Sequence, residues 1–207
     1  MPQKIDLETW PRSALYKHFS ARSNPFYSVT FPVDVTKLYQ YAKANNLSFY
    51  YALIYLSTQA VNRVEAFRYT IENGAVYLLD KRHPSFTDLH PGSEQFHIVS
   101  MEQEGTLQAF CEAAKAKSRS QTEFLVSEKE SKDLIYYSSL PWFDITSLTN
   151  ERDFDPDDAI PRIAWGRYTE IHGQKKLHIS MELNHRFIDG LHIGRYYEAL
   201  TALMESL

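Results

Sequence analysis

Residues 177–190 carry the pattern that decides the fold, with the sequence LHISMELNHRFIDG. The odd positions from Leu177 to Leu183 are apolar and the even positions are polar, which is the two-residue period of a β-strand with one face toward a core. The same period places His185 on the apolar face, at the end of the strand. Asp189 and Gly190 follow, where a turn leads into a helix. The stretch therefore predicts a strand, a short connection and a helix, with a partly desolvated histidine between them.

The residues around this stretch extend the pattern on both sides. After Gly190, apolar side chains recur at the spacing of a helix that packs on a sheet; they are Ile193, Tyr196, Tyr197, Leu200, Leu203, Met204 and Leu207. Before it, the segments 163–168 and 177–187 flank residues 172–176, and this arrangement predicts a hairpin.

The rest of the chain alternates predicted strands and helices. Strands are expected near 27–35, 67–71, 75–79, 86–90, 95–101 and 133–140, and helices over 12–20, 36–45, 48–64 and 106–118. Asn73-Gly74 predicts a tight turn between two of the strands, and Pro32 predicts an edge strand or a bend. Because at least two connections are hairpins, we expect a mixed sheet rather than a doubly wound parallel one. The predicted fold is a single α/β domain of the α+β type over residues 1–207, in two layers, with helices packed on a mixed β-sheet.

Composition narrows the class of protein. The 207 residues are 43% hydrophobic and 23% charged, enough apolar material for one sizeable core. The net charge of −4 lacks the basic excess of a nucleic-acid-binding protein. Cys111 is the single cysteine, so neither an internal disulfide nor a cysteine-based zinc site is possible. With no signal-peptide core at the N-terminus and no apolar run of about 20 residues, we expect a cytoplasmic protein without a membrane partner.

Two interpretations of His185 remain open from the residues alone. In one, it is a core histidine satisfied by a neighbour, and Asp189-Gly190 only turns the chain. In the other, the desolvated imidazole is a catalytic base. Residues His172, His178 and His192 fit no standard metal-ligand spacing, so we expect no metal.

Residues 185–193, HRFIDGLHI, resemble the active-site signature of the chloramphenicol acetyltransferases, which is H-x-x-x-D-G followed by an apolar residue, a histidine and a β-branched residue. Other segments resemble further motifs of that family in the same order along the chain: Trp10-Pro11-Arg12 for W-x-R, Ile54-Tyr55-Leu56 with Gln59-Ala60-Val61-Asn62 for I-Y-L…Q-A-V-N, Pro84-Ser85-Phe86-Thr87 for P-x-F-T, and Ser138-Ser139-Leu140-Pro141-Trp142 for S-x-L-P-W.

The resemblance implies a role for each matching residue. His185 is expected to be the general base that takes the proton of an acceptor hydroxyl, and Ser138 to donate a hydrogen bond to the oxyanion. Asp189 is expected to pair with Arg12 and to hold the active-site loop. The implied reaction is direct acetyl transfer from acetyl-CoA to a hydroxyl of chloramphenicol or a related small molecule, without an acyl-enzyme. Acetyl-CoA is then a co-substrate, and no tightly bound cofactor is expected.

The resemblance also implies how the molecule assembles and binds CoA. Arg167 and Tyr168 fall where the family has a basic residue and a tyrosine that line the CoA channel. That channel runs between the subunits of a trimer, with the base from one subunit and most of the acceptor pocket from its neighbour. A homotrimer is therefore expected.

The acceptor pocket is where the chain departs from the family. The expected pocket residues are Phe19, Tyr27, Phe96, Leu148 and Arg162. Phe19 replaces a tyrosine, Arg162 an apolar residue and Ala164 a threonine. Asn184 stands where the signature often has a second histidine. We therefore expect slower acetylation of chloramphenicol than in typical members.

Three alternatives stay open for the function. The chain can act on a different hydroxyl acceptor, or it can be a non-catalytic member of the fold. The dihydrolipoyl acyltransferase core also has H-x-x-x-D-G, but such enzymes usually carry lipoyl domains, for which 207 residues leave no room.

Overall fold

A seven-stranded mixed sheet is the framework of the protein in the computed structural model, which describes residues 2–126, 131–153 and 155–207. Its strand order is β2 (Phe26–Asp34), β10 (Gln174–Asn184), β8 (Arg162–Gly166), β7 (Leu134–Leu140), β5 (His83–Leu89) and β6 (Phe96–Ser100), and β9 (Thr169–Ile171) pairs with β10. Strand β7 runs parallel to β5 and β8, and the other pairs are antiparallel. The predicted mixed sheet is confirmed, and the strand with Pro32 lies at its edge.

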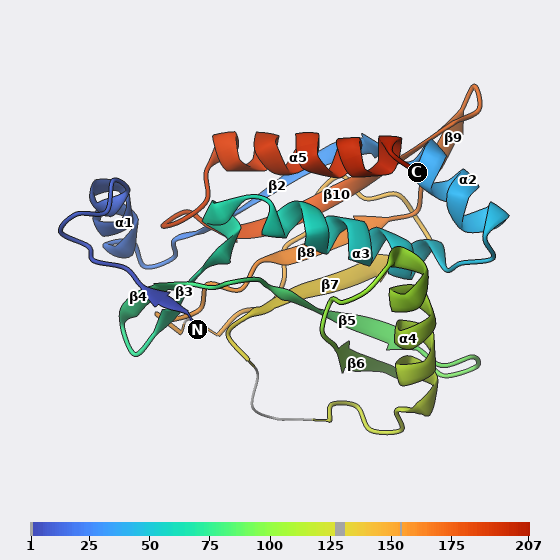
Figure 1. Cartoon of the computed structure of the whole chain (residues 1–207), viewed down its shortest axis with the longest axis horizontal. Helices are drawn as coiled ribbons and strands as arrows, with labels where there is room; N and C mark the ends of the chain where they lie inside the picture. The colour runs from blue at the N-terminus through green and yellow to red at the C-terminus, as the bar shows by residue number, and fades with distance from the viewer. Residues whose placement is uncertain (1, 127–130, 154) are drawn as a thin grey trace.

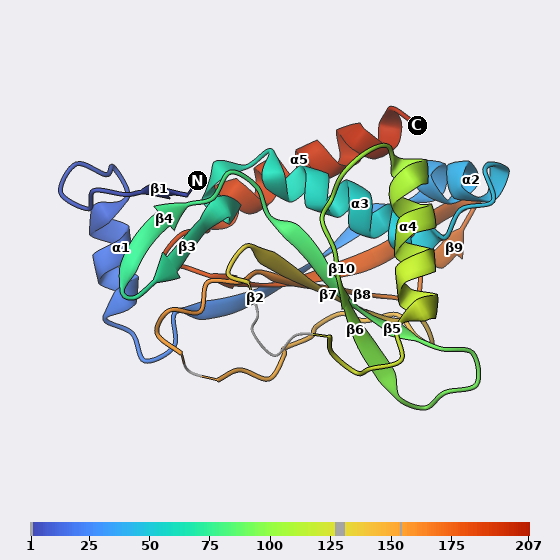
Figure 2. The same cartoon turned by 60° about the horizontal axis from the view of Figure 1, so that its bottom comes forward.

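Helices cover one face of this sheet. Figures 1 and 2 show α3 (Phe49–Asn62) and α5 (Gly190–Glu205) lying side by side over it, with α4 (Leu107–Ser120) beside β6. The helices α1 (Ser13–Ser20) and α2 (Thr36–Ala44) lie at opposite ends of the molecule. The connection from β7 to β8 runs along the other face, below the sheet in Figure 2. We call this second face the far face.

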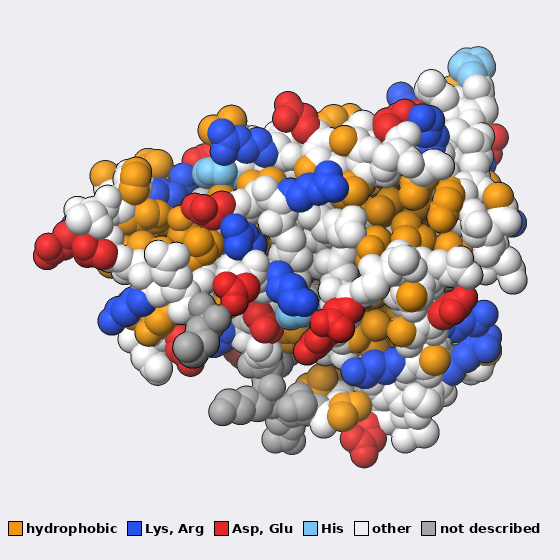
Figure 3. Space-filling view, in the orientation of Figure 1, with side chains coloured by type: hydrophobic (Ala, Val, Ile, Leu, Met, Phe, Trp, Pro, Cys, Tyr) orange, Lys and Arg blue, Asp and Glu red, His pale blue; other side chains and the backbone are white. Residues whose placement is uncertain are grey.

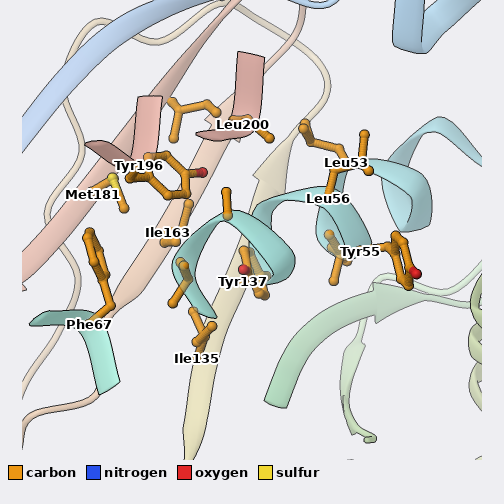
Figure 4. Close-up of a cluster of buried hydrophobic side chains, with 14 of the residues drawn as sticks. Leu53, Tyr55, Leu56, Phe67, Ile135, Tyr137, Ile163, Met181, Tyr196 and Leu200 are labelled. Carbon is orange, nitrogen blue, oxygen red and sulfur yellow. The ribbon is translucent and has the colours of Figure 1, made fainter. Parts of the chain in front are cut away.

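The core lies between the sheet and the two central helices (Figure 4). Leu53 and Leu56 of α3 and Leu200 of α5 are buried against Ile163 and Met181 of the sheet. Because α3 is buried on most of its surface, it needs apolar residues nearly all round, as its sequence has. Ser48 caps it by accepting from the Tyr51 N–H.

The predicted hairpin at Asn73-Gly74 belongs to a second, smaller sheet. It joins β3 (Tyr69–Glu72) to β4 (Ala75–Leu78), after a 3₁₀ turn at Glu65–Arg68, and β4 also pairs with β1 (Gln3–Lys4). Asn73 and Gly74 have φ angles of 51° and 74°, as this tight turn requires. A two-residue strand has too few residues to show a period, so the sequence did not predict this sheet.

The hairpin before α5 differs from its prediction at the turn. Residues 172–176 were expected to connect the strands, but the turn is only His172-Gly173, with φ angles of 52° and 80°, and β10 begins at Gln174. Its polar face is buried as well, since Glu182 and Asn184 are 6% and 2% exposed. The connection on the far face covers these side chains, and a strand period carries no information on what covers a face.

The surface carries charges of both signs. Figure 3 shows acidic and basic side chains interspersed over one face of the molecule, without a large patch of one sign. Among the described residues, no helix is both long and apolar enough to cross a membrane.

Candidate active site

The signature histidine lies in a tight turn between β10 and α5. The turn closes with hydrogen bonds from the N–H groups of Phe187 and Ile188 to the carbonyl of Asn184, at 3.1 and 3.0 Å. His185 itself still donates its N–H to the Pro25 carbonyl at 2.8 Å, so it begins where β10 ends. We call residues 184–189 the His185 loop.

Arg12 holds this loop with three separate hydrogen bonds. Its Nη1 donates to Asp189 Oδ2 at 2.8 Å, its Nε to the Arg186 carbonyl at 2.9 Å and its Nη2 to the His185 carbonyl at 3.2 Å. The side chains of Arg12 and Asp189 are only 13% and 32% exposed. The expected ion pair is therefore present, and the same guanidinium also determines where the backbone of His185 lies.

Asp189 performs a second task as the N-cap of α5. Its Oδ1 accepts from the Leu191 N–H at 3.1 Å, and His192 Nδ1 accepts from the Asp189 N–H at 3.1 Å, which completes a capping box. Burial raises the pKa of Asp189, but the hydrogen bond from Arg12 and the neighbouring charges outweigh burial, so its pKa lies below the usual value. The aspartate is thus ionised and anchors both the loop and the helix.

The imidazole of His185 lies between two aromatic rings. Phe19 of α1 stacks on it with ring centroids 3.9 Å apart, and the Tyr27 ring of β2 lies 4.4 Å away. The Tyr27 hydroxyl donates to the Ile188 carbonyl at 3.2 Å and so also braces the loop. Burial, and then the positive charge of Arg12, lower the pKa of His185 below its ordinary value of 6.5. The ring is therefore neutral at pH 7, as a general base has to be.

Ser138 lies on the far face, well away from His185 of the same chain. Through the strand pairing, Ser138 of β7, Ala164 of β8 and Ser180 of β10 form one row across the sheet. His185 lies beyond the end of β10, five residues after Ser180 and two strands away from Ser138. With about 3.3 Å per residue and 4.8 Å between strands, the Cα atoms of His185 and Ser138 are roughly 19 Å apart. Thr87 Oγ1 donates to the Ser138 hydroxyl at 3.4 Å. One chain therefore does not bring the predicted base and the predicted oxyanion donor together.

Arg167 and Tyr168 line a surface hollow of about 430 Å³, together with Trp142, Phe143 and Asp144. Gly166 makes this arrangement possible, because a Cβ there would lie 2.7 Å from the Phe143 carbonyl oxygen. Trp142 and Phe143 are 68% and 54% exposed, which is unusual for such large apolar side chains.

The expected acceptor residues fall into three places. Phe19 and Tyr27 contact His185, whereas Leu148 and Arg162 lie on the far face, where the Leu148 carbonyl accepts from Ser180 Oγ at 3.3 Å. Phe96 lies on β6, four strands away from β10, and is 50% exposed next to Phe124. These groups do not form one pocket within a single chain.

The sequence did not predict a cluster of charged side chains on the far face. We call Arg152, Asp158, Arg162 and Glu182 the arginine–carboxylate cluster. Arg152 donates from Nε to Glu182 and from Nη1 to Asp158, and its guanidinium lies 3.4 Å from the centre of the Phe26 ring. Arg162 Nη2 lies 3.5 Å from the same Asp158 oxygen. Two guanidinium groups thus share one carboxylate oxygen.

Glu182 ties the covering connection to the sheet. Its Oε2 accepts from the Asn150 backbone N–H at 2.8 Å and from the Asn150 side chain at 3.3 Å. Burial raises the pKa of Glu182, but these hydrogen bonds and the one from Arg152 outweigh burial, so its pKa lies below 4.5. Glu182 stands at a polar position of β10 that points away from the core, so the alternation gave no signal of this pairing.

Cys111 and the histidines do not offer other chemistry in this region. Cys111 is buried in the core, and burial raises the pKa of its thiol to about 12, so it is not a thiolate nucleophile at pH 7. The described residues contain no group of three or more His, Cys, Asp or Glu side chains that is arranged to hold a metal ion.

Solved acetyltransferases share this architecture. A chloramphenicol acetyltransferase superposes with a TM-score of 0.87 at 24% identity, over 99% of this chain and 100% of that chain. The dihydrolipoamide acetyltransferase of Azotobacter vinelandii superposes with a TM-score of 0.63 at 17% identity, over 99% of this chain and 90% of that one. The chain therefore has the same fold as these two acetyltransferases.

Sequence comparison identifies the family within that class. The chloramphenicol acetyltransferase family model matches residues 2–201. A chloramphenicol acetyltransferase of Clostridium perfringens is 28% identical over 93% of this chain and 90% of its own length, and chloramphenicol acetyltransferase 3 of Escherichia coli is 26% identical over 98% and 97%. The chain belongs to the chloramphenicol acetyltransferase family and is a transferase.

Proposed function

We propose that the protein transfers the acetyl group of acetyl-CoA directly to a hydroxyl group of a small molecule, with His185 as general base. The observation that carries this proposal is the set of three hydrogen bonds from Arg12 to the His185 loop. It holds a neutral imidazole between two aromatic rings at a fixed position. A core histidine needs no such positioning by a guanidinium.

The reaction follows from these groups. His185 takes the proton of the acceptor hydroxyl while that oxygen attacks the thioester carbonyl carbon. The oxyanion that forms accepts a hydrogen bond from Ser138, a contribution of roughly 3–4 kcal/mol for a single such donor. The carbonyl then re-forms, the carbon–sulfur bond breaks, and the leaving thiolate takes the proton from His185. No acyl-enzyme is needed, and Cys111 takes no part.

The site is proposed to form between two copies of the chain in a homotrimer. The separation of Ser138 from His185 within one chain supports this arrangement, because a base and an oxyanion donor that act on one carbonyl must lie within a few ångströms of it. The pair of residue types has a parallel in the dihydrolipoamide acetyltransferase, where the role of a serine, a histidine and an asparagine in the catalytic mechanism was investigated.

Mixed trimers test this arrangement directly. His185→Ala and Ser138→Ala chains are each expected to be inactive alone. After unfolding and refolding together, they are expected to regain activity, because some interfaces then hold both intact groups. No recovery in a mixture of confirmed trimers would place both groups of a site in one chain.

Arg167 and Tyr168 are proposed to bind CoA at the hollow beside Trp142. A guanidinium suits the phosphates of CoA, and exposed aromatic rings suit its adenine. We also infer that the protein acts in the cytoplasm, where a single buried cysteine is stable as a free thiol.

Chloramphenicol is the first acceptor to test, since the relatives are named for it. Release of CoA thiol is measured with acetyl-CoA and a panel of hydroxyl compounds that includes chloramphenicol. We expect turnover, with chloramphenicol a slower substrate than for its relatives. Growth on chloramphenicol of the strain that expresses the protein shows whether the chain confers resistance to it. No transfer to any acceptor would indicate a non-catalytic member of the fold.

A further inference from the structure

Arg162 lies beside the reacting centre of the proposed site. Its neighbour Ile163 enters the core, so Arg162 projects to the far face, the same face as Ala164 and Ser138. Ser138 pairs with Ala164, and Arg162 stands two residues before Ala164, at the start of β8. At about 3.3 Å per residue and 4.8 Å between strands, its Cα lies roughly 8 Å from that of Ser138. The acceptor hydroxyl has to lie within a few ångströms of the carbonyl that Ser138 binds, so Arg162 is within reach of the rest of the acceptor.

The surface there offers both hydrogen-bond donors and acceptors. Arg162 and Asp158 have side chains that are 16% and 13% exposed and thus within reach of a ligand, while Arg152 and Glu182 lie deeper, at 5% and 7%. Each guanidinium of the cluster contacts a carboxylate, and each carboxylate contacts a guanidinium. The charge is compensated within the cluster, so little is left to attract an anion.

The cluster also disfavours an apolar acceptor. Covering Arg162 and Asp158 with an aromatic ring removes water from an ion pair without replacing its hydrogen bonds, which is costly. A hydroxyl group matches such a surface because it both donates and accepts.

We propose that the acceptor is a neutral polyhydroxyl compound of the sugar type, whose additional hydroxyls bind Arg162 and Asp158. This rests on the proposed function, since it assigns the acceptor of that same site. Arg162 is a specificity-determining residue in this proposal, and the arginine–carboxylate cluster takes the place of an apolar pocket wall.

Four acceptors separate the alternatives. Methyl glucoside is a neutral polyhydroxyl compound, methyl glucuronide is its anionic counterpart, and p-nitrobenzyl alcohol and chloramphenicol are aromatic alcohols. We expect kcat/KM to be at least about tenfold higher for the glucoside than for the two aromatic alcohols, and higher than for the anionic glucuronide. Arg162→Met is expected to lower kcat/KM about tenfold for the glucoside alone. The KM for acetyl-CoA and the oligomeric mass are expected to stay unchanged. Arg63→Met, at the end of α3 on the other side of the sheet, is the control.

Binding without turnover keeps this proposal separate from the proposed function. Saturation-transfer NMR with the His185→Ala protein is expected to detect methyl glucoside, and to lose the signal when Arg162→Met is added. If binding is seen but the wild-type protein transfers no acetyl group, the proposed function fails, and the assignment of a neutral polyhydroxyl ligand to Arg162 and Asp158 stands. A preference for the glucuronide or for an aromatic alcohol, or equal behaviour of Arg162→Met and Arg63→Met, would overturn the assignment.

Discussion

Two ion-paired clusters meet the same end of β10 from opposite sides of the sheet, and they use charge differently. At the His185 loop, one partly buried pair, Arg12 with Asp189, positions a neutral imidazole. In the arginine–carboxylate cluster, four charges compensate one another, and Glu182 anchors the covering connection. The first holds a reacting group and serves any acceptor. The second forms a surface, and it is joined to the His185 loop through the backbone of the covering connection, where the Asp158 carbonyl accepts from Asn184 and Arg186.

Removing the base gives the largest expected effect. His185→Ala is expected to lower kcat by about 10²–10⁴-fold, the usual contribution of a positioned general base, with CoA affinity unchanged. The control is His172→Asn in the β9–β10 turn, where asparagine tolerates the φ of 52°. Steady-state thiol release measures both variants. Retention of more than about a tenth of wild-type turnover in His185→Ala would be incompatible with this role, given the loss expected of a base.

Breaking the second cluster is expected to act on stability instead. Glu182→Ala leaves Arg152 buried beside one shared carboxylate and is expected to cost about 3–5 kcal/mol of unfolding free energy. The double variant Arg152→Leu/Glu182→Leu removes both charges and is expected to recover most of that loss. Urea unfolding measures each variant.

The control for that experiment is Glu205→Ala, since Glu205 is 61% exposed in its pair with Lys37. An exposed pair contributes about 0–1 kcal/mol. Equal losses for Glu182→Ala and Glu205→Ala would mean that the cluster does not hold the connection in place.

The Arg12–Asp189 pair is expected to show strong coupling. In a double-mutant cycle of Arg12→Ala and Asp189→Asn, the coupling energy in unfolding is expected to be about 0.5–3 kcal/mol, because the two groups share one hydrogen-bond network. The matching cycle of Arg12→Ala with Glu182→Ala should be close to additive if the clusters act separately. Zero coupling in the first cycle would contradict a stabilising interaction between Arg12 and Asp189.

The smallest expected effect is on the pH dependence of activity. Burial and the charge of Arg12 lower the pKa of His185. Because the base acts when neutral, activity is expected to persist below pH 6.5 and to fall only as the pH drops through that lowered pKa. Arg12→Ala removes the positive charge, so the acidic limb of kcat/KM is expected to move up toward 6.5. A wild-type limb at or above 6.5, or an unmoved limb in Arg12→Ala, would contradict this cause.

The sequence alone determined the local structure near His185. The two-residue period of residues 177–183 and the helical period after Gly190 are local signals, and the motif resemblance predicted the Arg12–Asp189 pair, which the structure contains. Asp189 as N-cap follows from its place before the helix. The turn at His172-Gly173 was misplaced, since strand ends are not marked by the alternation itself.

Only the tertiary structure decided what lies across the sheet. The order of strands sets Ser138 in one row with Ser180 and so separates it from His185, and no local pattern specifies which strands become neighbours. The pairing of Arg152 with Glu182 was likewise invisible, because alternation shows that a residue points away from the core but not what packs over it. The physical reason is the same in both cases: periodicity arises from the backbone of one strand, whereas contacts between strands and connections depend on how the whole chain packs.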